Sequence, residues 1–467
     1  MIDPPRPEHW ATKDNEFVAW YPLQLTPEGA ASVWQPRPAG YYVHIPYCTA
    51  ICDYCGFSVE RVKNADTGRY VRALHTEISR AADLGRLAGH EFVCGHFGGG
   101  TPSTLPPDQL VGVKKQLDSR ALVRPGAEVT VEVNPISFTR EHADVYAAGG
   151  INRISVGVQS FDDQILRLIG RPHRAGDVAN VVEVIHAAQI ENFSLDIIYG
   201  VPGQDIGQLR DDLKRAADTG ATHLTCFRLE IIPYTALKLR EAAGELPPRA
   251  SQQLLNEMDD VITETLAGFG YGNYGAFNFA KPGFQSVHND IAFGAPQGEY
   301  IGFGNSSYSY FNDCIYANHA TVPRYIADVE AGRDPIALGS RATALERMSR
   351  YFVLGVKLRR VPRRGFTERF GLEPEQVFGA VLDDLTERGM LRLTDDTYVL
   401  TGLGTQYVNN VCKAFYVGGN RGRPQYAQFV STLTRAQIGK YGKKAGAPVP
   451  PAGPPAAVPA SVRSGQR

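Results

Sequence analysis

Three cysteines, Cys48, Cys52 and Cys55, lie in one short run and are separated by three and then by two residues. Thiolates are the usual ligands of iron–sulfur clusters, and a cubane cluster of four irons normally takes four of them. Three thiolates on one loop would hold three irons and leave the fourth open to a substrate or a cofactor. The spacing therefore predicts a catalytic 4Fe-4S cluster on this loop.

Two other chemistries are open to these thiols. A structural zinc site needs a fourth ligand and usually two Cys-x-x-Cys pairs, and the sequence contains no second pair. A disulfide with one spare thiol is less consistent with seven cysteines in a long chain, a number that suits a reducing compartment. We expect the remaining cysteines to be small buried apolar residues. These are Cys94, Cys226, Cys314 and Cys412.

The composition sets limits on partners and location. The 467 residues include 48 basic and 49 acidic ones, a net charge of -1, so no overall field attracts nucleic acid or an acidic membrane. The chain starts without an apolar leader, and no run reaches the roughly 20 apolar residues that span a bilayer. We expect a cytoplasmic protein that acts on a small molecule, with no nucleic acid and no membrane as partners.

Short runs rich in β-branched and aromatic residues alternate with helical patterns from Tyr41 onward, which is typical of an α/β fold with a parallel sheet. The first helical pattern places Tyr70, Val71, Leu74 and Ile78 on one face. Six runs predict strands. They are Tyr41 to Ile45, Phe92 to Phe97, Glu128 to Val133, Arg153 to Val158, Ser194 to Ile198 and His223 to Phe227.

Polar or glycine-rich motifs follow these runs or lie within them. Since ligands bind at the carboxyl ends of parallel strands, we expect the motifs to meet in space. Three glycines would let the backbone approach a ligand, and their amides could meet a carboxylate, although a plain tight turn is also possible. The motifs are Gly-Gly-Gly-Thr-Pro-Ser from Gly98, Glu-Val-Asn-Pro from Glu132, Gly-Val-Gln-Ser-Phe from Gly157, and Asp196 ahead of Tyr-Gly-Val-Pro-Gly.

Single side chains in these motifs have both functional and ordinary interpretations. Glu132 and Asp196 lie in apolar runs, where a carboxylate must meet hydroxyls or an ammonium group, unless both are helix caps or solvated. Gln159 and Arg171 could be ordinary surface residues. His288 precedes a stretch rich in glycine and serine, Glu299 to Ser307, which resembles a loop approaching a ligand, but a lone histidine is more often structural.

Together these motifs make the chain resemble a radical S-adenosylmethionine (SAM) enzyme, and more narrowly the oxygen-independent coproporphyrinogen III oxidase family. The run Tyr-Val-His-Ile-Pro-Tyr-Cys leads into the cysteine loop, and the four later motifs follow in the family's order. Leu-Thr-Gly-Leu-Gly-Thr-Gln-Tyr-Val-Asn-Asn-Val-Cys, from Leu400 to Cys412, is similar to the family's C-terminal signature. The resemblance covers about Tyr41 to Tyr416.

The resemblance implies an α/β fold, a partial (β/α)6 radical SAM barrel with an N-terminal arm and a small winged-helix-like α+β domain. We expect the arm at 1–40, the barrel with the cluster loop and a substrate-side extension at 41–340, and the C-terminal domain at 341–442. Helical patterns from Ala342 to Phe415 and a ribbon at Tyr398 to Thr401 favour that domain. Residues 443–467 are mostly Ala, Pro, Gly and Val, which predicts a disordered tail.

The resemblance also assigns roles to residues. Cys48, Cys52 and Cys55 would hold the cluster, whose open iron would chelate SAM, and a donor such as flavodoxin or ferredoxin would supply the electron that cleaves it. Contacts to this first SAM are implied for Tyr42, Gly99 and Glu132. Contacts to a second SAM are implied for Tyr54, Gly100, Thr101, Gln159, Arg171 and Asp196. Catalytic roles are implied for His44, Tyr54 and Arg171.

The family contains three activities that share one scaffold. Oxidases decarboxylate propionates of coproporphyrinogen III, methyltransferases and cyclopropane-forming enzymes use the second SAM as a one-carbon donor, and heme chaperones carry a His-Asn-x-x-Tyr-Trp motif. This chain has Ala292 and Phe293 at the last two positions of that motif. Gly56-Phe57 also replaces the oxidase's Gly-Cys, and Phe227-Arg228-Leu229-Glu230 adds charges at the end of the sixth run.

These departures favour methyl or methylene transfer, that is methylation or cyclopropanation, to an sp2 carbon of a specialised metabolite. The oxidase and the heme chaperone are the alternatives. A DNA-binding regulator is suggested only by the winged-helix-like end and the basic run from Arg359 to Arg364, and such a run is usually a solvated face.

Overall fold

The computed structural model describes residues 2, 38–293 and 298–418. The predicted tail at 443–467 therefore lies outside the described residues, as does the arm at 1–40 apart from residues 2 and 38–40.

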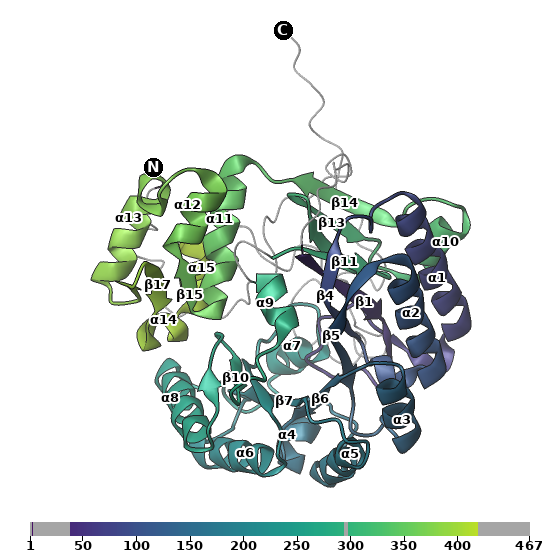
Figure 1. Cartoon of the computed structure of the whole chain (residues 1–467). Coiled ribbons are helices and arrows are strands. Elements are labelled where there is room, and N and C mark those ends of the chain that lie inside the picture. The colour runs from purple at the N-terminus through teal and green to yellow at the C-terminus, as the bar shows by residue number, and fades with distance from the viewer. Residues whose placement is uncertain (1, 3–37, 294–297, 419–467) are drawn as a thin grey trace.

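The described part of the chain is built on a 12-stranded sheet, shown in Figure 1. Seven neighbouring strands are parallel, in the order β11-β1-β4-β5-β6-β7-β8. All six predicted strands are confirmed among them. The parallel strands are β1 (Pro38–Ile45), β4 (Glu91–Gly99), β5 (Leu122–Val133), β6 (Arg153–Gln159), β7 (Phe193–Tyr199), β8 (His223–Arg228) and β11 (Tyr300–Phe303). Antiparallel strands extend both edges. They are β9 (Gly272–Asn273) and β10 (Asn278–Ala280) beside β8, and β12 (Tyr308–Phe311), β13 (Cys314–Asn318) and β14 (Ile336–Arg341) beside β11.

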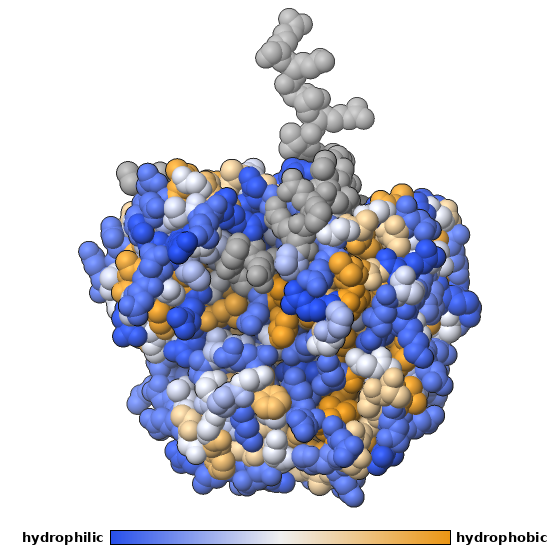
Figure 2. Space-filling view, viewed as in Figure 1, coloured by the Kyte–Doolittle hydropathy of each residue, from blue (hydrophilic) through white to orange (hydrophobic). Residues whose placement is uncertain are grey.

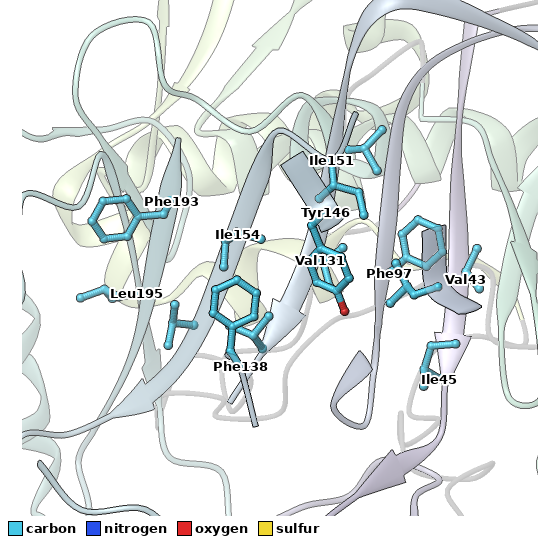
Figure 3. Packing of buried hydrophobic residues seen from close by; sticks show 14 of the residues in the cluster. Val43, Ile45, Phe97, Val131, Phe138, Tyr146, Ile151, Ile154, Phe193 and Leu195 are labelled. Carbon is cyan, nitrogen blue, oxygen red and sulfur yellow. The ribbon is translucent and has the colours of Figure 1, made fainter. Parts of the chain in front are cut away.

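Helices cover the outer face of the parallel sheet (Figure 1). The predicted apolar face of the first helix is confirmed, because Tyr70, Val71, Leu74 and Ile78 are all buried on α1. Figure 3 shows how apolar side chains of neighbouring strands, such as Val131 and Ile154, pack with Phe138 and Tyr146. The helices of this part of the chain are α1 (Thr67–Asp83), α2 (Pro107–Arg120), α3 (Arg140–Ala148), α4 (Asp163–Leu168), α5 (Ala175–Ala187), α6 (Ile206–Asp218), α7 (Ala236–Ala242), α8 (Gln252–Gly268), α9 (Val287–Phe293) and α10 (Val322–Glu330). Two of them do not cover the outer face: α7 contacts the cysteine loop, and α9 packs on the inner side of β4.

Residues on the other face of the parallel strands are largely polar. On β5, for example, Val129 and Val131 belong to the core shared with the helices, whereas Glu128 and Thr130 alternate with them and are also buried. Alternate residues of a strand point to opposite faces, so the inner wall of the partial barrel is polar while its outer wall is apolar. A barrel interior of this kind suits a polar ligand.

The prediction of a loop from Glu299 to Ser307 is wrong for its first part. Tyr300–Phe303 forms β11, pairs in parallel with β1, and buries Ile301 and Phe303 in the main core. Gly302 weakened the strand pattern, but a glycine is needed there, because a Cβ would lie 2.4 Å from the carbonyl oxygen of Tyr308.

A second hydrophobic core belongs to the C-terminal part of the chain. Its centre is aromatic, since Phe352 stacks on Phe415 at 4.6 Å and packs against Phe366 and Phe378. The expected helices and ribbon are present, and a third strand joins the ribbon. The elements are α11 (Ala344–Gly355), β15 (Arg360–Pro362), α12 (Arg363–Phe370), α13 (Pro374–Glu387), β16 (Leu391–Thr394), β17 (Thr397–Leu400), α14 (Gly402–Gln406) and α15 (Val408–Ala414).

The surface in Figure 2 is mainly hydrophilic on the face shown, with hydrophobic side chains in smaller groups between. Among the described residues, no helix is both long enough and apolar enough to cross a membrane.

A buried carboxylate ties the extension beyond β11 to the barrel helices. Glu77 of α1 accepts hydrogen bonds from the amide of Gly304 at 2.8 Å, from Asn318 Nδ2 at 2.7 Å and from the Tyr325 hydroxyl at 2.7 Å. Burial nevertheless raises the pKa of Glu77 to about 7 from its ordinary value of 4.5. The folded protein therefore holds this proton more tightly than the unfolded chain does.

We predict that Glu77→Gln flattens the dependence of stability on pH. A raised pKa means that the carboxyl favours folding most below its unfolded value of 4.5, and that this contribution is lost as the pH rises toward about 7. The free energy of unfolding should be measured in urea between about pH 5 and about pH 8. Its fall over this range should be roughly 1–3 kcal/mol larger for the native protein than for Glu77→Gln. The exposed Glu141→Gln is the control, and parallel pH profiles for the native protein and Glu77→Gln would contradict the prediction.

Candidate functional site

The three thiols of the cluster loop line one cavity of about 680 Å³ at the carboxyl ends of the parallel strands. The cavity also contains most of the other predicted site residues, so motifs far apart in the sequence do meet. Those on its wall are Tyr54, Gly99, Gly100, Thr101, Glu132, Gln159, Arg171 and Asp196. Tyr42 and His44 are not part of this wall.

The thiols of the loop are not used in disulfides. All seven cysteines are free, so the disulfide alternative is wrong, and Cys94, Cys226, Cys314 and Cys412 are buried as expected. A cubane cluster would bind each of the three loop thiolates to a different iron.

The triple glycine has a different role from the one expected. The amides of Gly100 and Thr101 donate to the carbonyl oxygens of Ile45 and Tyr47, each at 2.8 Å, and so are not available to a ligand. A Cβ on Gly100 would lie 2.8 Å from the Tyr47 oxygen and 2.9 Å from the Ile45 oxygen. The glycine therefore lets this loop pack directly on the backbone that enters the cysteine loop. Thr101 Oγ1 also lies 3.5 Å from Cys48 Sγ.

The cysteine loop is held on its other side by Asp53. Its carboxylate accepts a hydrogen bond from Arg240 Nη1 of α7 at 2.6 Å, and the same nitrogen donates to the carbonyl oxygen of Leu168 at 2.7 Å. The backbone of Asp53 donates to Ile169 and accepts from Leu237. The pair is largely shielded from solvent, with 18% of the Arg240 side chain and 23% of the Asp53 side chain exposed.

Arg171 and Gln159 are not ordinary surface residues. Arg171 donates to Cys52 Sγ at 3.3 Å and to the carbonyl oxygen of Gly157, while its Nε is buried without a partner among the described residues. Gln159 is buried and has a left-handed backbone with a φ of 70°. Such a conformation is uncommon outside glycine and often marks a functional site.

The two carboxylates meet different partners. Glu132 accepts a hydrogen bond from His96 Nε2 at 2.9 Å, and Asp196 lies 3.5 Å from the hydroxyl of Ser155. Burial, together with the nearby charge of Glu132, raises the pKa of Asp196 to about 7. A ligand with an ammonium group or hydroxyls beside Asp196 would favour the ionised carboxylate.

Three histidine rings line the barrel interior behind this wall. The Tyr42 hydroxyl lies 3.1 Å from His44 Nδ1, and the ring of His96 stacks between those of Tyr42 and His288, at 5.9 Å and 4.5 Å. Burial lowers the pKa of His44 to about 4 and that of His288 well below its ordinary value. Both rings are therefore neutral near pH 7.

Sequence reasoning missed a large part of the cavity wall. Beyond the predicted Phe227 to Glu230 segment, the wall includes residues of α8, such as Asp259 and Asp260, and of the C-terminal domain, such as Arg359 and Gln406. Asp259 and Asp260 lie in no motif, and although Gln406 and Arg359 lie in the C-terminal signature and the basic run, nothing in those patterns placed them at the cavity.

Two of the four arginines in the basic run at the start of the C-terminal domain form ion pairs. Arg363 forms ion pairs with Glu373 at 2.7 Å, Glu375 at 2.8 Å and Asp396 at 3.4 Å, and Arg364 pairs with Glu368 at 2.7 Å. Arginines paired in this way contribute little to phosphate binding, so Arg363 and Arg364 do not support a DNA-binding surface.

Comparisons with known proteins agree with this architecture. The model of the radical SAM superfamily matches residues 42–216, and that of the HemN C-terminal domain matches residues 342–407. The heme chaperone HemW of Bacillus subtilis is 30% identical over 381 residues, which cover 80% of this chain and 98% of the chaperone. The oxygen-independent coproporphyrinogen III oxidase of Bradyrhizobium diazoefficiens is 27% identical, over 85% of this chain and 89% of the oxidase.

A solved structure is also similar along most of the chain. Coproporphyrinogen III oxidase (HemN) from Escherichia coli, a radical SAM enzyme, superimposes with a TM-score of 0.70 at 25% sequence identity. The match covers 81% of this chain and 90% of the oxidase.

We predict that Arg240→Ala weakens retention of the cluster without unfolding the protein. Removing the guanidinium leaves the half-buried Asp53 carboxylate unpaired, which costs about 1–3 kcal/mol and loosens the loop between Cys52 and Cys55. Iron content and the rate of loss of cluster absorbance in the presence of a chelator measure the effect. Arg249→Ala, which removes a more exposed partner of Glu241, is the control. Equal rates of cluster loss in both variants would contradict a role of the Asp53–Arg240 pair in holding the cysteine loop.

Proposed function

Because the chain belongs to the radical SAM superfamily, in the family that includes HemW and the oxygen-independent coproporphyrinogen III oxidases, we propose that it is a catalyst of radical methyl or methylene transfer. The acceptor would be an sp2 carbon of a small molecule. The cofactors are a 4Fe-4S cluster and SAM, which, when bound, supply a 5'-deoxyadenosyl radical.

The observation that carries the proposal is a second set of polar groups in the same cavity as the cysteine loop. Glu132 and Gly99, which the resemblance assigns to the first SAM, line this cavity, and Gln159, Arg171 and Asp196 form a further polar group on its wall. Arg171 Nε is a buried donor without a protein partner, which suits a carboxylate, and Asp196 suits an ammonium group or hydroxyls. Two amino-acid-like ligands could then share the cavity, one as radical source and one as one-carbon donor.

The protein's own residues would position these ligands rather than transfer protons between them. His44 is neutral near pH 7 and does not lie on the cavity wall, so we assign it to support of Tyr42 and the barrel interior. Arg171, which contacts Cys52, would link the second ligand to the cluster loop. Tyr54, on the wall between two of the cysteines, would separate the two ligands.

A heme chaperone is the second candidate, because HemW proteins of several bacteria are 28–32% identical to this chain. The 27% identity to the Bradyrhizobium oxidase is nearly the same, so identity does not choose between the activities. The side chain of His288 counts against the chaperone, since its ring stacks on His96 inside the barrel. Ala292 also stands where the chaperone motif has its tyrosine.

We predict that the native protein forms both 5'-deoxyadenosine and S-adenosylhomocysteine when it is reconstituted without oxygen and supplied with dithionite, SAM and an acceptor substrate. Mass spectrometry of both products, with and without candidate unsaturated metabolites, is the measurement. Cys48→Ala, Cys52→Ala and Cys55→Ala should each lose the cluster and both products, because each variant leaves only two thiolates to hold the four irons.

Cys94→Ala is the matched control, because Cys94 is buried and does not line the cavity. This variant should form both products in unchanged amounts. Vinyl products from coproporphyrinogen III would support the oxidase instead. Stoichiometric heme binding with no SAM cleavage would support the chaperone, and either result would reject the transfer proposal.

We predict that Arg171→Ala and Asp196→Asn weaken the second SAM about tenfold or more and the first much less, because each removes a charged hydrogen-bonding group from the second set. Equilibrium titration of the reconstituted protein with labelled SAM resolves the two sites. Arg174→Ala, an exposed arginine outside the cavity, is the control. If both variants weaken SAM binding equally at the two sites, or if the native protein binds a single SAM, the assignment of Arg171 and Asp196 to a second SAM site is wrong.

A further inference from the structure

Part of the cavity wall is built jointly by the barrel and the C-terminal domain. The segment from Asn273 to Phe277 connects them, because the amide of Ala276 donates to the carbonyl oxygen of Lys357 at 2.7 Å and Arg359 Nη1 donates to that of Asn273 at 3.1 Å. In Figure 1 this joint lies where β10 and α8 meet the C-terminal domain.

Arg359 is an unusual residue of this joint wall. It has a left-handed backbone with a φ of 61°, and burial lowers the pKa of its guanidinium. Its Nε is buried without a hydrogen-bond partner, and among the described residues only the backbone oxygen of Asn273 accepts from its side chain. A partly buried cation without a carboxylate is costly, so this edge of the guanidinium is suited to an anion supplied from the cavity.

Two neighbouring carboxylates on the wall already have hydrogen-bond partners. Arg228 donates to Asp259 at 2.9 Å, and the same carboxylate accepts from the Tyr199 hydroxyl at 2.5 Å. Asp260 accepts from Gln406 Nε2 at 3.0 Å. Arg359 therefore differs from Arg228 in having no ion pair among the described residues.

Apolar aromatic surface lines the same cavity as this cation. The rings of Phe227 and Phe277 pack with centroids 6.0 Å apart and an angle of 33°, and both line the cavity. Phe227 is 38% exposed, and the amide of its neighbour Cys226 donates to the carbonyl oxygen of Phe277. Such a surface favours a flat, unsaturated ligand body.

We propose that Arg359 is the anion-binding residue of the substrate subsite, and that the substrate is an unsaturated or aromatic carboxylic acid whose flat body lies on Phe227 and Phe277. This inference names the substrate class of the proposed function and rests on it. The carboxylate would take the Nε edge of the guanidinium, which offers parallel donors, while Nη1 stays bonded to Asn273.

A carboxylate fits this place better than a phosphate. Among the described residues on the part of the wall shared with the C-terminal domain, Arg359 is the one cation without a carboxylate partner, and the carboxylates of Asp259 and Asp260 lie on the same wall. A second negative charge on the ligand would therefore add repulsion without a second partner. The planar Nε edge also matches two coplanar oxygens.

Calorimetric binding of probes to the reconstituted protein with SAM present tests the inference. The probes are 2-naphthoate, its methyl ester and 2-naphthyl phosphate. The native protein should bind the naphthoate about tenfold or more tightly than the ester, as expected for a charge-assisted hydrogen bond in a partly buried site. Arg359→Gln should remove this preference, and Arg359→Lys, which keeps the charge but not the planar edge, should keep part of it.

Arg360→Gln is the matched control, because it removes the same charge from the next residue, which is exposed and lies outside the cavity. It should bind all three probes as the native protein does. The inference is overturned if the native protein binds the naphthoate and its ester equally tightly, or binds neither. It is also overturned if Arg359→Gln still binds the naphthoate more tightly than the ester. Phosphate binding as tight as that of the naphthoate overturns the carboxylate assignment. Probe binding does not require SAM cleavage, so failure of the proposed function is seen separately, as absence of 5'-deoxyadenosine.

Discussion

The constraint on which this structure depends is a barrel wall that is apolar outside and polar inside. The outer side chains supply the hydrophobic core with the helices, and their burial offsets the cost of the polar interior. Inside, charged groups are compensated in place. Glu128 and Arg153, both almost fully buried, lie 3.9 Å apart, and Glu132 accepts from His96. A polar interior that is already paired can admit polar ligands at its open end without losing the fold.

The cysteine loop supplies only three thiolates to a four-iron cluster, so its shape must be held by the surrounding protein. The protein holds it from two sides, by the backbone of Gly100 and Thr101 at its start and by the Asp53–Arg240 pair at its centre. Both contacts come from rigid elements, the end of β4 and helix α7. A functional loop depends on a rigid scaffold to position it. These contacts explain how an open iron on the loop could be held at a fixed position relative to the rest of the cavity.

The C-terminal domain has a core of its own yet completes the cavity of the barrel. Its contribution changes the chemical character of the wall, adding Arg359 from the basic run and Gln406 from the segment similar to the family's C-terminal signature. Members of one fold family differ in activity through such residues rather than through the scaffold. The charges that replace the oxidase pattern after Phe227 lie on this wall, where Arg228 is paired with Asp259.

The sequence by itself determined the features that depend on short-range patterns. The spacing of Cys48, Cys52 and Cys55, the six apolar runs and the buried face of α1 are local, and each has the expected form. The tertiary structure alone decided which groups are left free for a ligand. It assigned the Gly100 amide to backbone contacts, placed His44 behind the wall and turned Tyr300–Phe303 into a strand. It also brought Arg359 to the cavity, because contacts between segments far apart in the chain leave no periodic signal in either segment.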